Sequence, residues 1–374
     1  MEAYLTDLLA AIAVVINGIP QGLLALSFGF AGFPTALAFI AGMAGSLYFN
    51  SVATISFQAE TIALAGSMGK DIKERCSIVF WGGLIILVLS LLGLNEKMVD
   101  FIGPVILNSM MAGVGIMLAY VAIDLLNSEK ISGAVSMASA LAVWFVTKDL
   151  AKTIIISVIL ATAVYNLLIK AGKVERASLS HDNSRERFTL GNVEWNVLKK
   201  PRLLVNALGL ACLTIGANIS FGKITGAIAN AETNIDHLSI YSAVADMVSS
   251  FFGGGPVEAI ISGTATAPHP ITASVMMMGI MAVVLFLKLL PVIGRYVHSS
   301  SIAGFLFVLG TFVTFASNVQ GAIASAPMEI LNSGAPFGFS PWGMMVGATI
   351  LVSARWNPFY GLLAGLGIKI IFSL

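Results

Sequence analysis

Apolar segments recur along the whole chain, and most are long enough to cross a membrane. A hydrocarbon core about 30 Å thick requires roughly 20 apolar residues in a helix. The pattern therefore predicts an all-α polytopic membrane protein with 14 transmembrane segments. The predicted segments span residues 5–30, 34–50, 52–67, 75–94, 99–126, 131–147, 149–170, 203–224, 239–252, 254–267, 272–290, 292–318, 340–354 and 357–373.

One long polar interval, residues 171–202, divides this pattern into two halves. Seven segments precede it and seven follow it. We therefore predict a first repeat over 1–170, a solvated connector over 171–202 and a second repeat over 203–374. Because each half has an odd number of segments, the second copy would enter the membrane from the opposite side, as inverted repeats do.

Short sequence matches between the halves support a duplication. The motif at 109–113, which ends in Ala112 and Gly113, recurs at 300–304 with an offset of 191 residues. Residues 26–29 match 219–222 with an offset of 193. Residues 58–62 face 256–260 with an offset of 198. The three matches keep their order along the chain. The Ala-Gly pairs in the first match predict close helix packing.

The third and tenth segments are short, and each contains one glutamate, Glu60 or Glu258, in otherwise apolar sequence. Short interrupted segments at corresponding positions of inverted repeats indicate a binding site. We predict that each begins with extended backbone and continues as a half-helix, and that Pro256 is the first residue of the second half-helix. An ionisable residue at membrane depth marks a site or pathway. A carboxylate in a first helical turn also stabilises the helix dipole without any other function.

Composition supports a membrane protein and offers little sign of an enzyme or metal site. Of 374 residues, 57% are hydrophobic and 10% charged, with 37 glycines. The two cysteines, Cys76 and Cys212, do not support a disulfide framework. No catalytic motif of a known class is recognised, and we expect neither a cofactor nor a metal. We expect an integral multi-pass protein of a bacterial-type plasma membrane, with a homodimer left open.

The seven-plus-seven plan, the polar third segment and the Phe252-Gly-Gly-Gly-Pro256 entry to the tenth resemble the nucleobase–ascorbate transporters, also called xanthine/uracil permeases. The resemblance covers essentially the full length. It implies a core domain of segments 1–4 and 8–11 and a gate domain of segments 5–7 and 12–14, with an elevator-like or rocking motion between them. It also implies a nucleobase held between half-helices 3 and 10 and helix 8. Many members carry an acid on helix 8, where this chain has Asn218.

The resemblance and the chemistry of a heterocycle together select the candidate site. A nucleobase edge presents N–H donors and carbonyl acceptors, which carboxylates and amides complement. Aromatic rings can supply an apolar wall, and Phe28 and Phe221 are further candidates for it. Proton coupling is assigned to Glu60, Glu258 and Asp246. The predicted substrate-binding residues are Glu258, Glu60, Gln58, Phe57, Asn218, Ala59 and Val257.

The predicted function is a secondary transporter of a purine or uracil, coupled to H⁺. The main alternative is a sulfate- or bicarbonate-like anion transporter on the same seven-plus-seven plan. An anion site gains from positive charge, and no lysine or arginine falls in the middle of segments 1, 3, 8 or 10. A membrane-embedded enzyme is the alternative from a different class.

Lysines and arginines are distributed unevenly between the two predicted faces. About 15 fall on the side of the connector and about 5 on the side of the termini. The positive-inside rule then predicts a cytoplasmic connector and external termini. The family resemblance implies the reverse, with cytoplasmic termini. His269 and His298, near span ends, are expected to be capped or exposed to water.

Overall fold

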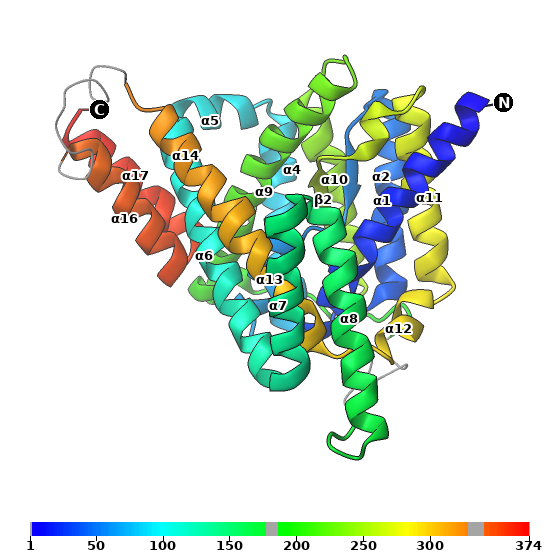
Figure 1. Ribbon diagram of the computed structural model, residues 1–374. Coiled ribbons are helices and arrows are strands. Elements are labelled where there is room, and N and C mark those ends of the chain that lie inside the picture. The colour runs from blue at the N-terminus through cyan, green and yellow to red at the C-terminus, as the bar shows by residue number, and fades with distance from the viewer. Residues whose placement is uncertain (1, 177–185, 328–339, 374) are drawn as a thin grey trace.

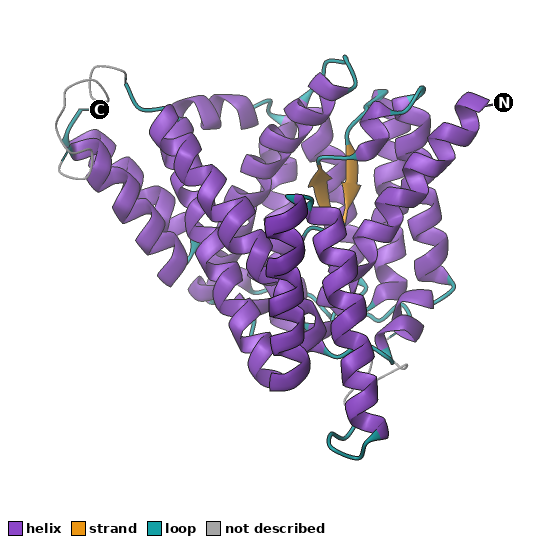
Figure 2. Cartoon of the chain, in the orientation of Figure 1, coloured by secondary structure: helices purple, strands orange, loops and turns teal. Residues whose placement is uncertain are grey.

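The computed structural model describes residues 2–176, 186–327 and 340–373, and the chain is almost entirely helical (Figure 2). The first half comprises α1 (Glu2–Ser27), α2 (Gly32–Phe49), β1 (Thr54–Ser56), α3 (Ala59–Met68), α4 (Ile72–Leu91), α5 (Asn95–Ile102), α6 (Pro104–Ser128), α7 (Lys130–Thr147) and α8 (Leu150–Lys170). The second half comprises η1 (Val197–Lys199), α9 (Pro201–Ile228), α10 (Ile235–Phe251), β2 (Glu258–Ile260), η2 (Gly263–Thr266), α11 (Pro270–Phe286), α12 (Leu289–Gly294), η3 (Ser299–Ile302), α13 (Ala303–Val308), η4 (Leu309–Phe315), α14 (Ala316–Ala324), α16 (Pro341–Arg355) and α17 (Pro358–Ile371).

Eight helical spans within the described ranges are long and apolar enough to cross a membrane. Two shorter apolar helices, α11 and α17, accompany them. The chain is therefore an integral multi-pass membrane protein, as its hydrophobic pattern predicts. The predicted bounds of segments 1, 2, 4, 6, 7 and 8 agree with the helices to within a few residues.

Two predicted single spans are divided in the structure. Segment 99–126 is separated into α5 and α6 at Gly103, which directly precedes Pro104. Gly103 has a φ of +88°, a backbone conformation that favours glycine. The predicted start of segment 292–318 is wrong, because α12 ends at Gly294 and the next span begins at η3. That span contains η4, a π-helical stretch of seven residues, a deviation that is often found at functional sites.

The prediction for the third segment is confirmed, and the prediction for the tenth is wrong. Extended β1 leads into the ten-residue helix α3. In contrast, residues 254–267 form no half-helix. They contain β2 and the four-residue 3-10 turn η2, so Glu258 lies in a strand and not in a first helical turn.

Pairing with β1 explains the extended tenth segment. The strands are antiparallel, with Ser56 opposite Glu258 and Thr54 opposite Ile260. This pairing satisfies backbone N–H and C=O groups that would otherwise remain unpaired away from water. The preceding glycines also oppose a helix, and Gly253 has a φ of +93°. A Cβ at Gly254 would approach the Thr35 backbone nitrogen to 2.7 Å.

The helices pack in two groups. Helices α1, α2 and α4 pack with α9, α10 and α11 around β1, β2 and α3. Helices α6, α7 and α8 pack with α13, η4, α14, α16 and α17. Figure 1 shows α1, α2 and α11 of the first group on the right of the molecule and the α16–α17 pair at its left edge. The division into a core domain and a gate domain stays a prediction.

The Ala-Gly pairs do provide close packing, as predicted. A Cβ on Gly304 would collide with the Ser136 carbonyl of α7. A Cβ on Gly113 would approach the Ile350 carbonyl of α16 to 2.7 Å. Because glycine has no side chain, the helix backbones can approach each other closely at these positions, as in other membrane helix pairs.

Both termini lie at one face of the molecule, and the end of α8 that leads into the connector lies at the other (Figure 1). Ion pairs follow the same division. Glu194 of the connector pairs with Lys73 at 3.7 Å and with Lys200 at 2.8 Å. On the terminal face, Lys223 pairs with Glu96 at 3.3 Å. Which face is cytoplasmic stays a prediction.

Candidate functional site

The candidate site is built around the start of α3. Residues 54–58 are extended because β1 pairs with β2, and the helix then begins at Ala59 with Gln58 as its N-cap. The Gln58 side chain makes no capping hydrogen bond. The first N–H groups of a helix lack helical acceptors and carry a partial positive charge. This helix start therefore favours a negative or hydrogen-bond-accepting group.

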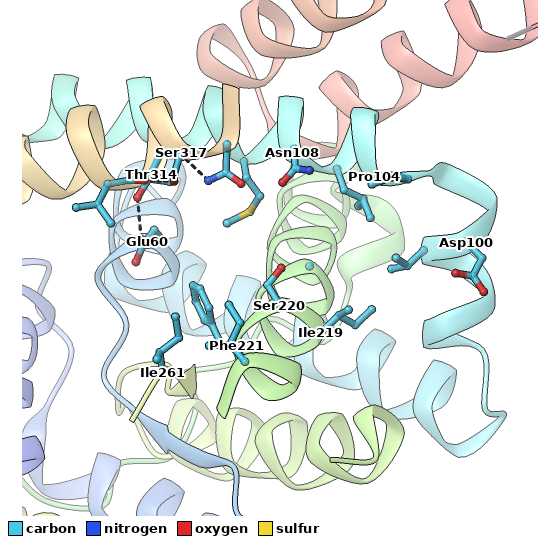
Figure 3. A pocket seen from close by; sticks show the side chains of 17 residues that line it. Glu60, Asp100, Pro104, Asn108, Ile219, Ser220, Phe221, Ile261, Thr314 and Ser317 are labelled. Atoms are coloured by element: carbon cyan, nitrogen blue, oxygen red, sulfur yellow. Dashed lines mark hydrogen bonds between the residues drawn. The ribbon is translucent and has the colours of Figure 1, made fainter. Parts of the chain in front are cut away.

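A cavity of about 650 Å³ adjoins Glu60 on one side (Figure 3). It lies between α5, α6, α9 and the η4–α14 segment. Apolar side chains such as Met111, Phe221 and Val313 form much of its wall. Its polar side chains, besides Glu60, are Asp100, Asn108, Ser220, Thr314, Ser317 and Asn318.

A second cavity, of about 310 Å³, adjoins Glu60 on the other side. It lies between α1, the end of β1, the start of α8 and the segment after β2. Phe57 and Gln58 line it, together with Asn17 and Gln21 of α1. Four side chains line both cavities: Glu60, Phe221, Ile261 and Val313. These four side chains therefore form a partition between the two cavities.

Thr314 holds Glu60 in this partition. The Thr314 hydroxyl donates a hydrogen bond of 3.0 Å to Glu60 Oε1, as Figure 3 shows. Glu60 is 5% exposed, and its Oε2 is buried without a hydrogen-bond partner among the described residues. Thr314 lies in η4, so the bond joins the first turn of α3 to the π-helical stretch.

Glu258 lies in β2, and its side chain bonds to Thr61, the residue that follows Glu60 on α3. Its side chain is fully buried, and its Oε2 accepts a hydrogen bond from the hydroxyl of Thr61 on α3. It is not among the described residues that line either cavity. The sequence predicted that a first helical turn would present Glu258 to the site. In β2, the side chain instead points away from the cavities.

Asp246 and Val257 are buried like Glu258. The Val257 N–H donates a hydrogen bond of 2.8 Å to Asp246 Oδ1, and both side chains are at most 1% exposed. Asp246 is thus a buried acid, as predicted, and it fixes the chain between Gly255 and β2. Ala59 is buried as well and is the first residue of α3.

Asn218 and Phe28 face other structural elements. The Asn218 amide donates to Ser239 and Ser242 of α10, at 3.2 Å each, and its side chain is fully buried. The Arg75 guanidinium lies 5.6 Å from the centre of the Phe28 ring. Neither Asn218 nor Phe28 is among the described residues that line the cavities, whereas Phe221 of α9 lines both.

Both histidines lie at helix starts, where His269 is exposed and the side chain of His298 is a cap, in agreement with the sequence. His269 precedes α11 and its Nδ1 lies 2.8 Å from Asp7 Oδ2. The Nδ1 of His298 accepts from the Ser300 N–H at the start of η3. Neither histidine lines the cavities among the described residues.

The cavities contain negative but no positive side chains. Of the described residues that line them, none is a lysine or arginine, and the acids are Glu60 and Asp100. Among the described lining groups, partial positive charge is expected only from the backbone N–H groups at the start of α3. No group of three or more metal-binding side chains was found in the described parts of the chain.

Sequence reasoning missed Thr314, Asn108, Ser317 and Asn318. Asn108 lies on α6 in the first half of the chain, and the other three lie on η4 and α14 in the second half, within long apolar spans. One available signal was the cluster of polar residues Thr314, Ser317 and Asn318 at helical spacing within an apolar span.

Three solved structures share this fold. SLC26A9 superposes with a TM-score of 0.70 at 12% identity, over 100% of this chain and 65% of that chain. Murine Slc26a9, described as an anion transporter in the inward-facing state, gives 0.71 at 12% identity, over 99% and 68%. The transmembrane domain of the cyanobacterial bicarbonate transporter BicA gives 0.65 at 13% identity, over 97% of both chains.

This chain thus spans about two thirds of SLC26A9 and nearly all of the BicA transmembrane domain. No protein-family model matches the sequence, and no curated protein matches it. Sequence identities this low establish the fold and leave the substrate open.

The structural neighbours correct the family predicted from the sequence. They are SLC26 anion transporters, a different family from the nucleobase–ascorbate transporters. The features that suggested the latter, a short polar third segment and a glycine-rich entry to the tenth, therefore do not identify the family. The chain therefore shares the fold of these three transporters.

Proposed function

We propose that this chain is a secondary active transporter of a small anion and that Glu60 carries a proton together with the anion. The observation that carries the proposal is the position of Glu60. It lies at the start of α3, in the partition between two cavities that no described lysine or arginine lines. The anion-transporter fold of the neighbours supports the substrate class.

The start of α3 supplies the attraction for an anion. Unpaired backbone N–H groups at a helix N-terminus bind carboxylate, phosphate and similar groups directly. The partial positive charge contributes up to about 2 kcal/mol in a partly buried site. The hydroxyls and amides of Thr314, Asn108 and Ser220 add further donors around the larger cavity.

An ionised Glu60 would oppose the same anion. Two unit negative charges about 5 Å apart repel by about 3 kcal/mol at an effective dielectric constant of about 20. This repulsion exceeds the attraction expected from the helix terminus. Protonation of Glu60 removes it and leaves an O–H donor in the site. Anion and proton would therefore bind together, which is the requirement for symport.

The proposed architecture has 14 segments in two inverted repeats of seven. The core domain would contain segments 1–4 and 8–11, and the gate domain segments 5–7 and 12–14. Glu60 lies on the first group of helices, and its partner Thr314 lies on the second. Movement of one group against the other would then make or break this bond as the site changes its access.

A nucleobase is a weaker candidate. Its family argument is overturned by the structural neighbours, and Glu258 and Asn218, two of its proposed partners, do not line the cavities among the described residues. Xanthine and uracil therefore serve as comparison substrates.

Uptake into proteoliposomes tests the proposal. We expect an inward proton gradient to accelerate uptake of at least one anion among radiolabelled bicarbonate, sulfate, chloride and short carboxylates. Uptake should fall when a protonophore removes the gradient at constant membrane potential. Gradient-driven uptake of xanthine or uracil without any anion uptake would overturn the anion assignment. Anion uptake that is indifferent to the proton gradient would overturn the role of Glu60.

A further inference from the structure

An apolar groove lies on the surface of the membrane domain, outside the candidate site. It has a volume of about 510 Å³ and runs between α1, α8 and the end of α12. Of its twelve lining side chains, only those of Thr162 and Tyr296 carry a polar atom. Several of the others are well exposed, including Ile16 at 45% and Ile159 at 61%. We expect an exposed surface of this composition to face the acyl chains of the bilayer.

The groove lies toward the connector face. Its α8 residues, from Ile155 to Ala163, continue toward Lys170 at the end of that helix. Tyr296 closes the groove at this end, and the Asn166 amide of α8 donates a hydrogen bond of 2.9 Å to the Tyr296 carbonyl. Tyrosine is enriched at the depth of lipid headgroups, where one end of its ring is apolar and the other polar.

Positive charge gathers at the same end. The Arg176 guanidinium lies 5.8 Å from the centre of the Tyr296 ring. Arg295 precedes Tyr296, and Lys170 and Lys173 follow the α8 residues of the groove. All four basic residues are exposed. The one acid in the sequence between Lys170 and Arg176 is Glu175. Basic clusters beside a membrane surface attract anionic headgroups.

We propose that the groove binds an anionic phospholipid of the leaflet on the connector side. One acyl chain would lie between α1 and α8, and the phosphate would lie beside Arg176, Arg295 and the ring of Tyr296. The apolar lining selects a chain, and the basic end selects the charge of the headgroup. A zwitterionic phospholipid satisfies the first requirement and gains much less from the second.

Native mass spectrometry of the detergent-purified full chain tests this proposal. The protein is incubated with phosphatidylglycerol or phosphatidylcholine of identical acyl chains, and retained lipid is counted. We expect roughly a tenfold preference for phosphatidylglycerol, because several basic side chains contribute. Equal retention of the two lipids would overturn the proposal.

Two pairs of variants separate the headgroup from the acyl chain. Arg176→Gln should reduce phosphatidylglycerol retention about fivefold, whereas Lys97→Gln, which removes an exposed charge on the terminal face, should not. Ala163→Phe fills the groove and should reduce retention of both lipids. Ala138→Phe adds the same ring at an exposed position on α7 away from the groove and should leave retention unchanged. Equal retention by the two phenylalanine variants, or by Arg176→Gln and Lys97→Gln, would contradict the site. Because Arg176 lies on the surface, its variant tests the proposal even where Ala163→Phe folds poorly.

Discussion

Thr314 donates a hydrogen bond of 3.0 Å to Glu60, although the two residues are 254 positions apart. One lies in the first turn of a short helix and the other in a π-helical stretch. The bond crosses from one packed group of helices to the other, beside both cavities. The carboxyl group is thus placed where its charge can affect both the bound anion and the contact between the groups.

Replacement of Glu60 by glutamine tests the role of the charge. The amide resembles the protonated carboxyl in shape and cannot ionise. In the wild type, we expect anion affinity to fall about 100-fold as Glu60 ionises, which corresponds to about 3 kcal/mol of repulsion. Glu60→Gln should abolish this dependence on pH. The measurement is anion binding by purified protein as a function of pH.

Glu96→Gln is the matched control, because Glu96 is exposed on the terminal face and pairs with Lys223. It should retain the pH dependence of the wild type. An unchanged pH profile in Glu60→Gln would contradict the proposed proton site.

Removal of the Thr314 hydroxyl tests the bond itself. Thr314→Val keeps the shape of the side chain and leaves the buried Glu60 carboxyl without its donor. Hydrogen bonds to charged groups contribute about 1.5–3 kcal/mol, so we expect transport to slow by about tenfold or more. Thr314→Ser should retain most of the rate.

Thr311→Val provides the comparison within the same π-helical stretch. The Thr311 hydroxyl bonds to the Phe307 carbonyl of its own span, at 2.7 Å. Its loss should change transport little. Equal effects of the two valine variants would indicate a general disturbance of the helix and no special role for Thr314.

Gly304→Ala should destabilise the protein. Its new Cβ would meet the Ser136 carbonyl of α7, a backbone atom that cannot move aside alone. Overpacking of this kind costs about 1–3 kcal/mol, which should appear as a lower unfolding temperature in detergent. Gly347→Ala is the control, because nothing lies within 4 Å of a Cβ at that position. Equal unfolding temperatures for the two variants would contradict the close contact between α7 and α13.

Glu129 predicts a pH-dependent contribution to stability outside the spans. It caps α7 by accepting from the Ile131 and Ser132 N–H groups, at 3.1 and 2.6 Å. Partial burial acts to raise the pKa of Glu129, but these hydrogen bonds outweigh it, so the pKa lies below its ordinary value. The stabilisation is therefore present above the unfolded pKa of about 4.3 and is lost as the pH falls through the folded value.

Glu129→Ala should lower stability at pH 7 by about 1 kcal/mol, as loss of an N-cap does. The difference from wild type should shrink as the pH falls below about 4. Thermal unfolding in detergent across this range provides the measurement. A difference that stays constant with pH would assign the effect to packing and not to the carboxylate.

A fluorescent protein fused to the C-terminus tests the orientation. The basic residues on the connector face, among them Lys73, Lys200 and Arg295, predict a cytoplasmic connector and an external C-terminus. A bacterial fusion that folds only in the cytoplasm should then remain dark. A fusion to the connector should fluoresce. Bright C-terminal fusions would reverse the assignment.

The hydrophobic pattern by itself determined that the chain spans a membrane many times, because the length of an apolar segment is a local property. It also located Glu60 and the break before α3, since a polar residue in a short apolar segment is visible without any knowledge of its neighbours. Close packing at the Ala-Gly pairs could be predicted for the same reason.

Only the tertiary structure decided what surrounds these residues. Glycines and Pro256 fit either a helix start or an extended chain, and pairing of β2 with β1, about 200 positions away, selected the extended form. That choice buried Glu258 against Thr61 and removed it from the cavities. The partnership of Glu60 with Thr314 likewise depends on the packing of α3 against distant helices. Contacts between residues so far apart leave no local signal in the sequence, which is why the site needed the fold to define it.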